Sequence, residues 1–271
     1  MSIVFIGGGN MAGALIGGLI AKGRSAAEIT VLEPQAAARA RLSERYGVAC
    51  VEQLAALDTL GEVVVFAVKP QQMRSAAAAL RPRLSRELVV TIAAGIRLGD
   101  LARWLGGHAA LVRCMPNTPA LVGAGITGLY AGATVDAAQR AVAEAILGAV
   151  GATLWVAEES MLDPVTAISG SGPAYVFYFI EALQRAAQEM GFTPQDARKL
   201  ALETFVGAAR LAAESGEDLA LLRERVTSKG GTTERALASM EADGIKDGIV
   251  RALHAANQRA QELGAQLGAD E

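Results

Sequence analysis

Residues 3–19 read IVFIGGGNMAGALIGGL, and this stretch constrains the fold more than any other part of the chain. A run of β-branched and aromatic residues leads into three glycines and then into a segment with helical spacing. Gly7, Gly9 and Ala12 fit G-x-G-x-x-A, where the glycines permit a tight turn and close approach of a pyrophosphate, and the small third residue permits close helix packing. Free N–H groups at the helix start would hold that anion. The stretch predicts dinucleotide binding; a glycine turn that serves packing alone is the alternative.

The same strand–helix alternation continues beyond this stretch. Five segments are continuous apolar runs, which are typical of strands buried on both faces of a parallel sheet. They cover residues 2–7, 28–33, 62–68, 87–94 and 110–115. Helical spacing is found at 10–23, 35–46, 70–81 and 135–150, and two more strand candidates lie at 125–131 and 152–157. The pattern predicts an α/β domain with a Rossmann-type, doubly wound, mostly parallel sheet.

Strand signals stop near residue 160. The chain then reads as helices separated by Gly, Pro or Asp, at 174–190, 194–215, 218–226, 233–242 and 245–267. A change from alternating β and α to α alone marks a change of domain. Asp163-Pro164 carries a helix-start signal. We therefore expect a dinucleotide-binding domain over 1–162 and an all-helical domain over 163–271.

Composition narrows the classes of partner. The net charge is −3 with Lys and Arg spread along the chain, so there is no basic patch for nucleic acid. Glycines or charges interrupt every apolar stretch before the ~20 residues of a membrane span. The two cysteines, Cys50 and Cys114, have neither disulfide nor metal-site spacing, which favours a reducing compartment. With no signal peptide before the first strand, we expect a cytoplasmic protein that binds neither nucleic acid nor membranes.

Further candidate residues follow the predicted strands, because ligands of open α/β sheets bind at the carboxyl ends of strands. The segments 67–71, 93–95 and 115–125 are expected there. Asn117 offers a carbonyl and an amide that suit a nicotinamide carboxamide, although Asn in a Pro-rich turn often bonds its own backbone.

Glu33 ends the second predicted strand. An acid at this position hydrogen-bonds the adenosine ribose and repels a 2′-phosphate, which favours NADH. Arg39 and Arg41 on the following helix would partly offset that charge, and an exposed strand-end carboxylate is the alternative reading. The sequence leaves NAD(H) and NADP(H) both open.

Residues 227–237, TSKGGTTERAL, form a second candidate site. The stretch ends in a helix start with unpaired N–H groups expected at Gly230, Gly231, Thr232 and Thr233. Such a nest binds a carboxylate, here helped by the Ser228 hydroxyl. A plain helix cap is the alternative.

Conventional catalytic groups are scarce. The two histidines, His108 and His254, read as surface or packing residues. No Ser-His-Asp arrangement is plausible and no metal-ligand cluster is visible, so we expect no metal. The chemistry must therefore come largely from the cofactor, with the protein supplying orientation.

Six motifs together resemble the pyrroline-5-carboxylate reductase family in order and approximate spacing: FIGGGNMA, AVKPQ, AAG, MPNTP, SGSGPAYVF and TSKGGTT. The likeness covers nearly the whole chain, and the last three motifs are its specific part. It implies NAD(P)H-dependent reduction of 1-pyrroline-5-carboxylate to L-proline, the last step of proline biosynthesis. It also implies a homodimer intertwined through the C-terminal helices, often assembled further into a decamer.

The resemblance also assigns roles to residues. It places cofactor contacts at Ile6, Gly7, Gly8, Gly9, Asn10, Met11, Ala67, Val68, Lys69, Pro70, Ala93, Ala94 and Gly95, with Asn117 near the nicotinamide. Ser228, Gly231 and Thr232 would hold the substrate carboxylate, next to Gly230 of the expected nest. The Thr233 hydroxyl would meet the ring nitrogen as the catalytic group. Glu33-Pro34 stands where many NADPH-preferring members have small polar or basic residues.

Two other functions stay open. A β-hydroxyacid dehydrogenase or related imine reductase shares a Rossmann domain followed by helices. The hydroxyacid enzymes resemble one another in a lysine on the interdomain helix, and here the helix after SGSGP has none before Lys199. A non-catalytic dinucleotide sensor would need the glycine turn but no carboxylate site.

Overall fold

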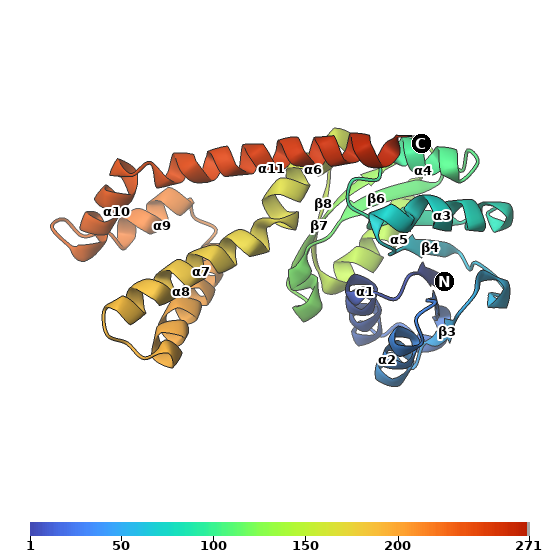
Figure 1. Cartoon of the computed structure of the whole chain (residues 1–271), viewed down its shortest axis with the longest axis horizontal. Helices are drawn as coiled ribbons and strands as arrows, with labels where there is room; N and C mark the ends of the chain where they lie inside the picture. Colours follow the sequence, from blue (N-terminus) through green and yellow to red (C-terminus); the bar gives the residue numbers. More distant parts are fainter. Residues whose placement is uncertain (270–271) are drawn as a thin grey trace. The chain divides into compact units, whose positions relative to one another are not determined.

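An eight-stranded sheet organises the first part of the chain in the computed structural model, which describes residues 1–269 (Figure 1). The strand order is β3-β2-β1-β4-β5-β6-β7-β8, and only β6 and β7 pair antiparallel. The strands are β1 (Ile3–Ile6), β2 (Ile29–Leu32), β3 (Ala49–Val51), β4 (Val63–Phe66), β5 (Leu88–Thr91), β6 (Leu111–Met115), β7 (Gly125–Ala131) and β8 (Gly151–Trp155). The predicted doubly wound, mostly parallel sheet is confirmed.

Hydrophobic clusters cover both faces of this sheet. In β1, Ile3 and Phe5 belong to one cluster and Val4 and Ile6 to the other, and all four are at most 4% exposed. Because successive strand residues point to opposite faces, burial on both faces produces the continuous apolar runs. Burial in the first cluster also raises the pKa of the Cys114 thiol. Helices α1 (Asn10–Ala21), α2 (Ala36–Tyr46) and α5 (Ala137–Leu147) contribute to the first cluster, and α3 (Pro70–Leu80) and α4 (Leu98–Trp104) to the second.

Local sequence fixes several helix ends. Helix α5 begins with a capping box, in which Gln139 N donates to Asp136 Oδ1 at 2.8 Å and Asp136 N donates to Gln139 Oε1 at 3.1 Å. Helix α3 begins with Pro70, whose missing N–H costs nothing in the first turn. Helix α2 ends at Gly47, which adopts φ +70°.

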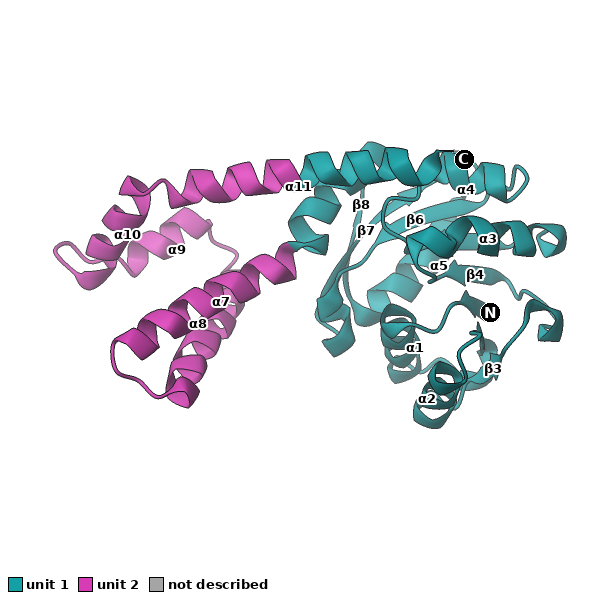
Figure 2. Ribbon diagram, viewed as in Figure 1, with its two compact units in different colours: residues 1–171, 256–271 teal, residues 172–255 magenta. Residues whose placement is uncertain are grey.

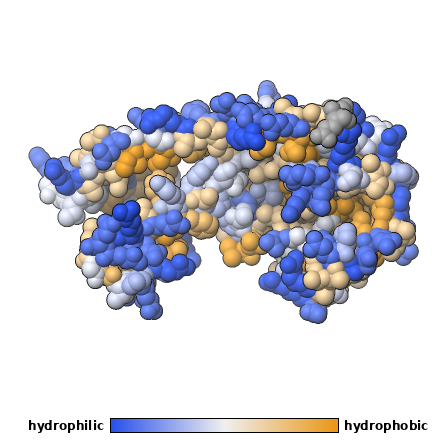
Figure 3. All heavy atoms as spheres, in the orientation of Figure 1, coloured by the Kyte–Doolittle hydropathy of each residue, from blue (hydrophilic) through white to orange (hydrophobic). Residues whose placement is uncertain are grey.

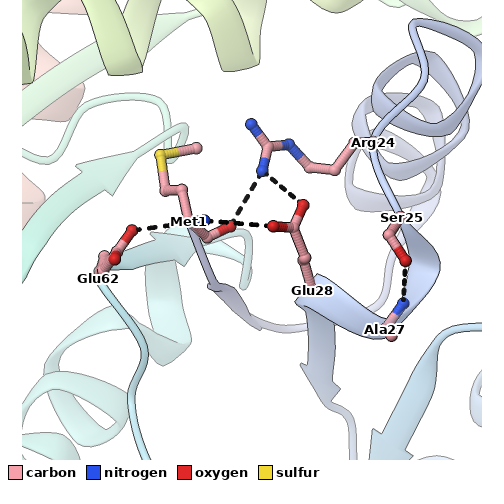
Figure 4. A network of polar contacts seen from close by, with 6 residues as sticks. All are labelled: Met1, Arg24, Ser25, Ala27, Glu28 and Glu62. Atoms are coloured by element: carbon pink, nitrogen blue, oxygen red, sulfur yellow. Dashed lines mark hydrogen bonds and ion pairs between the residues drawn. The ribbon is translucent and has the colours of Figure 1, made fainter.

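A polar network ties the start of β1 to the segment before β2 (Figure 4). The Met1 ammonium lies 3.2 Å from Glu28 Oε1 and 3.7 Å from Glu62 Oε2. Arg24 Nη1 donates to Glu28 Oε2 and to Met1 O, both at 2.9 Å. The hydrogen bond from the Met1 ammonium lowers the pKa of the Glu28 carboxyl, with Arg24 adding to the effect.

Packing divides the chain into two units (Figure 2). Unit 1 comprises residues 1–171 and the chain from residue 256 onward, and unit 2 comprises residues 172–255. The expected domains, 1–162 and 163–271, were placed where the type of secondary structure changes, so they do not coincide with these units and stay a prediction. Within the described residues, no helix combines the length and apolarity needed to span a membrane.

Unit 2 is all helical, as predicted for this part of the chain. It contains α7 (Gly172–Glu189), α8 (Pro194–Ser215), α9 (Leu219–Arg225), α10 (Thr232–Ala242) and the first part of α11 (Ile245–Gly268). Helix α8 begins where Thr193 Oγ1 accepts from Asp196 N at 3.2 Å and ends at Gly216, φ +65°. None of the described residues of α7 is buried, and large apolar side chains lie exposed on this unit (Figure 3).

Helix α4 of unit 1 was not predicted, and two further features were missed as well. Strand β3 has only three residues, 49–51, and pairs with β2 at the sheet edge. So short a run has no periodicity to detect. After α6 (Leu162–Val165), residues 166–170 form one π-helical turn before α7. Such turns frequently occur at functional sites.

Candidate functional site

The glycine turn after β1 has the geometry that dinucleotide binding needs. Gly7 adopts φ +101°, and a Cβ there would lie 2.9 Å from the carbonyl carbon and oxygen of Ala67. The turn therefore packs directly against the backbone that follows β4. Gly9 is the N-cap of α1 with no side-chain cap among the described residues, and a Cβ on it would meet nothing within 4 Å. Open space thus adjoins the positive end of the helix, where an anion is stabilised.

A cavity of about 860 Å³ opens at this turn. Its volume lies within the ~300–1,000 Å³ typical of small-molecule and cofactor sites. Nine of the predicted cofactor residues line it: Ile6, Gly7, Gly8, Gly9, Asn10, Glu33, Ala67, Val68 and Lys69. The carboxyl ends of β1, β2 and β4 meet here, as expected of an open α/β sheet.

The other predicted cofactor residues lie outside this cavity: Met11, Pro70, Ala93, Ala94, Gly95 and Asn117. Conversely, several lining residues were not predicted, among them Gln35, Glu52, Leu54, Gln72 and Ser75. Glu52 directly follows β3, so recognising that short strand would have marked its carboxyl end as part of the site.

Glu33 is held rigidly at the end of β2. The residue is 9% exposed, so the reading as an exposed strand-end charge is wrong. Gly8 N donates to Glu33 Oε2 and Gln35 N donates to Glu33 Oε1, both at 2.8 Å. A carboxylate that accepts two backbone N–H bonds is fixed in place beside the glycine turn, in the wall of the cavity.

Two of the three arginines of α2, Arg39 and Arg41, bond to neighbouring groups. Arg39 Nη2 donates to Glu52 Oε2 at 2.8 Å, and Arg39 Nη1 donates to the carbonyls of Glu33 and Pro34 at 2.9 and 2.7 Å. Arg41 lines the cavity and donates from Nη2 to Gly8 O at 3.1 Å. Arg39 thus bonds to lining residues without lining the cavity itself, and Arg41 is the arginine of α2 in the cavity wall.

Asn117 bridges two segments of unit 1. Its Nδ2 donates to Ser169 O at 3.1 Å, in the π-helical turn, and its Oδ1 accepts from Ile126 N at 2.9 Å. The side chain is 8% exposed. These partners lie outside the Pro-rich turn that the alternative reading expected, and the contact with a nicotinamide stays a prediction. Asn117 thereby fixes the SGSGP segment to the sheet.

A buried ion pair holds the same region. Arg113 on β6 is 4% exposed and lies 3.0 Å from Glu159 Oε1 and 3.6 Å from Asp163 Oδ1. Glu159 Oε1 also accepts from Leu98 N at 2.7 Å. A buried arginine with two carboxylates is costly to break, so this cluster keeps the segment after β8 on the sheet.

The helix start in TSKGGTTERAL differs from the expectation. Gly230 N donates to Glu234 Oε2 at 2.7 Å and Gly231 N donates to Ser228 O at 3.0 Å. The prediction of four unpaired N–H groups is therefore wrong for these two residues. Gly230 adopts φ +75°, and this turn brings the Glu234 side chain back over it.

Other N–H and hydroxyl groups of this stretch are free to bind a ligand. Gly231 is the N-cap of α10 without a side-chain cap, and the N–H groups of Thr232 and Thr233 have no partner among the described residues. The hydroxyls of Ser228 and Thr233 likewise have no partner in the part of the chain that the structure describes. Ser228 Oγ lies 2.6 Å from where a Cβ on Gly231 would be, directly beside the N-cap. Two N–H and two hydroxyl groups can therefore bind a small carboxylate.

Two family models match the chain. A model described as pyrroline-5-carboxylate reductase dimerisation matches residues 159–263. A second, described as NADP oxidoreductase, coenzyme F420-dependent, matches residues 2–95.

Curated relatives match over nearly the full length. A pyrroline-5-carboxylate reductase from Pseudomonas aeruginosa is 48% identical over 267 residues, which cover 98% of each chain. One from Haemophilus influenzae is 42% identical over 263 residues, covering 96% of this chain and 97% of its own.

Solved structures with the same family name are also similar to this chain. A pyrroline-5-carboxylate reductase from Coxiella burnetii superposes with a TM-score of 0.91 at 42% identity, covering 97% of this chain and 98% of that one. A pyrroline carboxylate reductase from Plasmodium falciparum with NADP bound has a TM-score of 0.86 at 27% identity, with the same coverage. Prephenate dehydrogenase from Aquifex aeolicus, at 15% identity and a TM-score of 0.54, shares the fold alone.

Proposed function

Because this chain belongs to the pyrroline-5-carboxylate reductase family, we propose that it reduces 1-pyrroline-5-carboxylate to L-proline with NAD(P)H. It is an oxidoreductase that acts on a C=N bond. The observation that carries this proposal is that one chain has both a cavity of cofactor size at the glycine turn of unit 1 and, in unit 2, a helix start whose free N–H and hydroxyl groups suit a small carboxylate. The reaction requires both kinds of site.

The residues of the glycine turn fit the cofactor. Gly9 leaves open space at the N-terminus of α1, and the N–H groups of Asn10 and Met11 precede the first helical hydrogen bond, from Gly13 N to Gly9 O at 2.9 Å. These groups would hold the pyrophosphate, with Lys69 as a nearby cation in the cavity wall. When bound, NAD(P)H supplies the hydride that reduces the imine.

The substrate site needs no strong acid or base. A protonated cyclic imine is already an electrophile, so addition of hydride to its carbon gives the amine without further proton transfer. The protein must hold the carboxylate and orient the ring nitrogen. The N–H of Thr232 and the Ser228 hydroxyl suit the carboxylate, and the Thr233 hydroxyl suits the nitrogen. Gly230 and Gly231 shape the turn instead of donating freely, since their N–H groups are paired.

We further propose NADH as the better cofactor. The Glu33 carboxylate is fixed by two N–H groups in the cavity wall and so would accept from a ribose hydroxyl. Glu52 lines the same part of the cavity, and Arg39 is paired with it. A 2′-phosphate would therefore lie near the carboxylates of Glu33 and Glu52. Arg41 is the one basic residue of α2 in the cavity wall.

The activity is tested by following the absorbance of NADH and of NADPH, separately, with 1-pyrroline-5-carboxylate at near-neutral pH. Oxidation that depends on the imine supports the reductase. A folded sample that binds dinucleotide but oxidises neither cofactor would contradict it, and would favour a related dehydrogenase or a sensor instead.

Assembly as a homodimer through unit 2 is also part of the proposal. The dimerisation model covers residues 159–263, and this region exposes many large apolar side chains, as a protein–protein interface does. They include Phe177 and Tyr178 of α7, Val206 and Leu211 of α8 and Val250 of α11. Further assembly of dimers into a decamer and a cytoplasmic location, with which the free thiols of Cys50 and Cys114 agree, extend the proposal.

Replacing Phe177 with Glu should convert the dimer to a monomer in analytical ultracentrifugation. Phe177 is 60% exposed in the single chain, and a charge buried in an apolar interface costs several kcal/mol. Gln188→Glu, which adds the same charge at an exposed polar position of α7, should leave the sedimentation coefficient unchanged. A Phe177→Glu variant that sediments as the wild type would place the interface elsewhere.

A further inference from the structure

The last two turns of α11 lie against the loop that follows β5, and we propose that they position this loop for dinucleotide binding. The proposal rests on the proposed function, since Ala93, Ala94 and Gly95 are cofactor residues by the family assignment alone. The helix belongs to the all-helical part of the sequence, yet its end is packed in unit 1 beside α4 (Figures 1 and 2).

Small residues recur at every fourth position of this part of α11, at Ala260, Gly264 and Gly268. Residues four apart lie on one face of a helix. Ala260 is 7% exposed and Gly264 is buried, so this face is covered. Without larger side chains, the helix backbone can approach its neighbour closely.

The neighbour is the loop at Gly95. A Cβ on Gly95 would lie 2.9 Å from Leu267 Cδ1 and 3.7 Å from Gly264 N. In the other direction, a Cβ on Gly264 would lie 3.3 Å from Arg97 Nε and 3.6 Å from Gly95 O. Because both residues are glycines, the backbone of the loop and the backbone of α11 can approach each other closely. Gly95 also adopts φ +77°, which favours glycine at this turn.

Polar contacts continue the packing into α4. Arg103 Nη2 donates to Gly268 O at 2.8 Å, and a Cβ on Gly268 would collide with the Asp100 carboxylate. Leu267 packs against the hydrophobic cluster that contains Ile96 and Leu101. The end of α11 therefore contacts the loop and the helix that follows it.

The loop depends on this outside support. Ala94 carries only a methyl group and Gly95 no side chain, so neither residue can anchor the loop through a polar or large apolar group of its own. On the inner side, Ala93 N donates to Thr91 Oγ1 at 3.2 Å and Ile92 N to Phe66 O at 3.1 Å. These bonds fix the start of the loop beside the carboxyl end of β4, where the chain continues into the cavity wall. The orientation of the N–H and C=O groups at Gly95 is then set by α11.

Replacing Gly264 with Leu tests the proposal. The added side chain must push the loop away from α11, so the dissociation constants of NADH and NADPH, measured by fluorescence titration, should rise about tenfold or more. In turnover, the KM for the dinucleotide should rise while the KM for the imine stays unchanged. Ala265→Leu is the matched control, since Ala265 is exposed on the same turn and should change neither constant.

Two milder variants keep the test decisive if Gly264→Leu does not fold. Gly264→Ala places one methyl group 3.3 Å from Arg97 Nε, and Leu267→Ala removes the contact with Gly95 without adding bulk. Each should weaken dinucleotide binding by a smaller factor. Folded variants with unchanged dissociation constants, or variants in which the imine and dinucleotide constants rise equally, would overturn the positioning role. Direct dinucleotide titration separates this outcome from failure of the proposed reduction, because it requires no imine.

Discussion

Replacing Thr233 with Val should lower kcat by about 10²–10³-fold, the loss seen when one donor to a developing charge is removed. The substitution keeps the β-branched shape at the second residue of α10 and replaces the hydroxyl with a methyl group. That hydroxyl has no partner among the described residues, so its loss breaks no internal hydrogen bond. The melting temperature should therefore stay within ~2 °C of the wild type, as for surface substitutions away from structural contacts.

Thr233→Ser is the control, because it retains a hydroxyl and should keep most of the turnover. The KM for the imine should change less than kcat in Thr233→Val, since the Thr232 N–H and the Ser228 hydroxyl remain to hold the carboxylate. Steady-state kinetics with circular dichroism melting would measure both effects. Wild-type turnover in Thr233→Val would remove Thr233 from the catalytic role.

Replacing Glu33 with Ser should raise the ratio of kcat/KM for NADPH to that for NADH by more than about tenfold. Two like charges about 4 Å apart repel by ~1–4 kcal/mol near a protein surface, and tenfold corresponds to 1.4 kcal/mol. Removing the carboxylate ends this repulsion and also frees Gly8 N and Gln35 N to donate to a phosphate. Arg41, already in the cavity wall, adds a cation.

Two further variants separate charge from position. Glu33→Gln keeps the size of the side chain and removes its charge, so it should move the ratio in the same direction by less. Glu44→Ser makes the same change at an exposed position of α2 and should leave the ratio unaltered. An unchanged ratio in Glu33→Ser would mean that Glu33 serves only to brace Gly8.

Local pattern made the sheet predictable. Continuous apolar runs arise whenever both faces of a strand are buried, so β1, β4 and β5 could be located without tertiary information, and β7 was predicted with the bounds Gly125–Ala131 that it has. The antiparallel pairing of β7 with β6 was not predictable, because strand direction depends on how the connecting loop at residues 118–122 folds back.

The two candidate sites differed in how far the sequence could describe them. The glycine turn is a local structure whose residues are consecutive, and the cavity formed where they indicated. The helix start of α10 was predicted with four free N–H groups, but the partners of two lie in the turn itself, at Glu234 and Ser228. The Glu234 side chain, which folds back onto its own helix start, and the Ser228 carbonyl each accept from an N–H group that the sequence pattern leaves free.

The sequence by itself determined the Rossmann-type sheet, the glycine turn for a dinucleotide and the all-helical second part, because each depends on residues close together in the chain. Only the tertiary structure decided how Glu33 is fixed and that the end of α11 returns to the loop at Gly95. The Gly95–Gly264 contact joins residues far apart in sequence. Outside a motif such as that of Gly7 and Gly9, a glycine leaves no pattern to read, so the role of Gly264 becomes visible only when the backbone that approaches it is known.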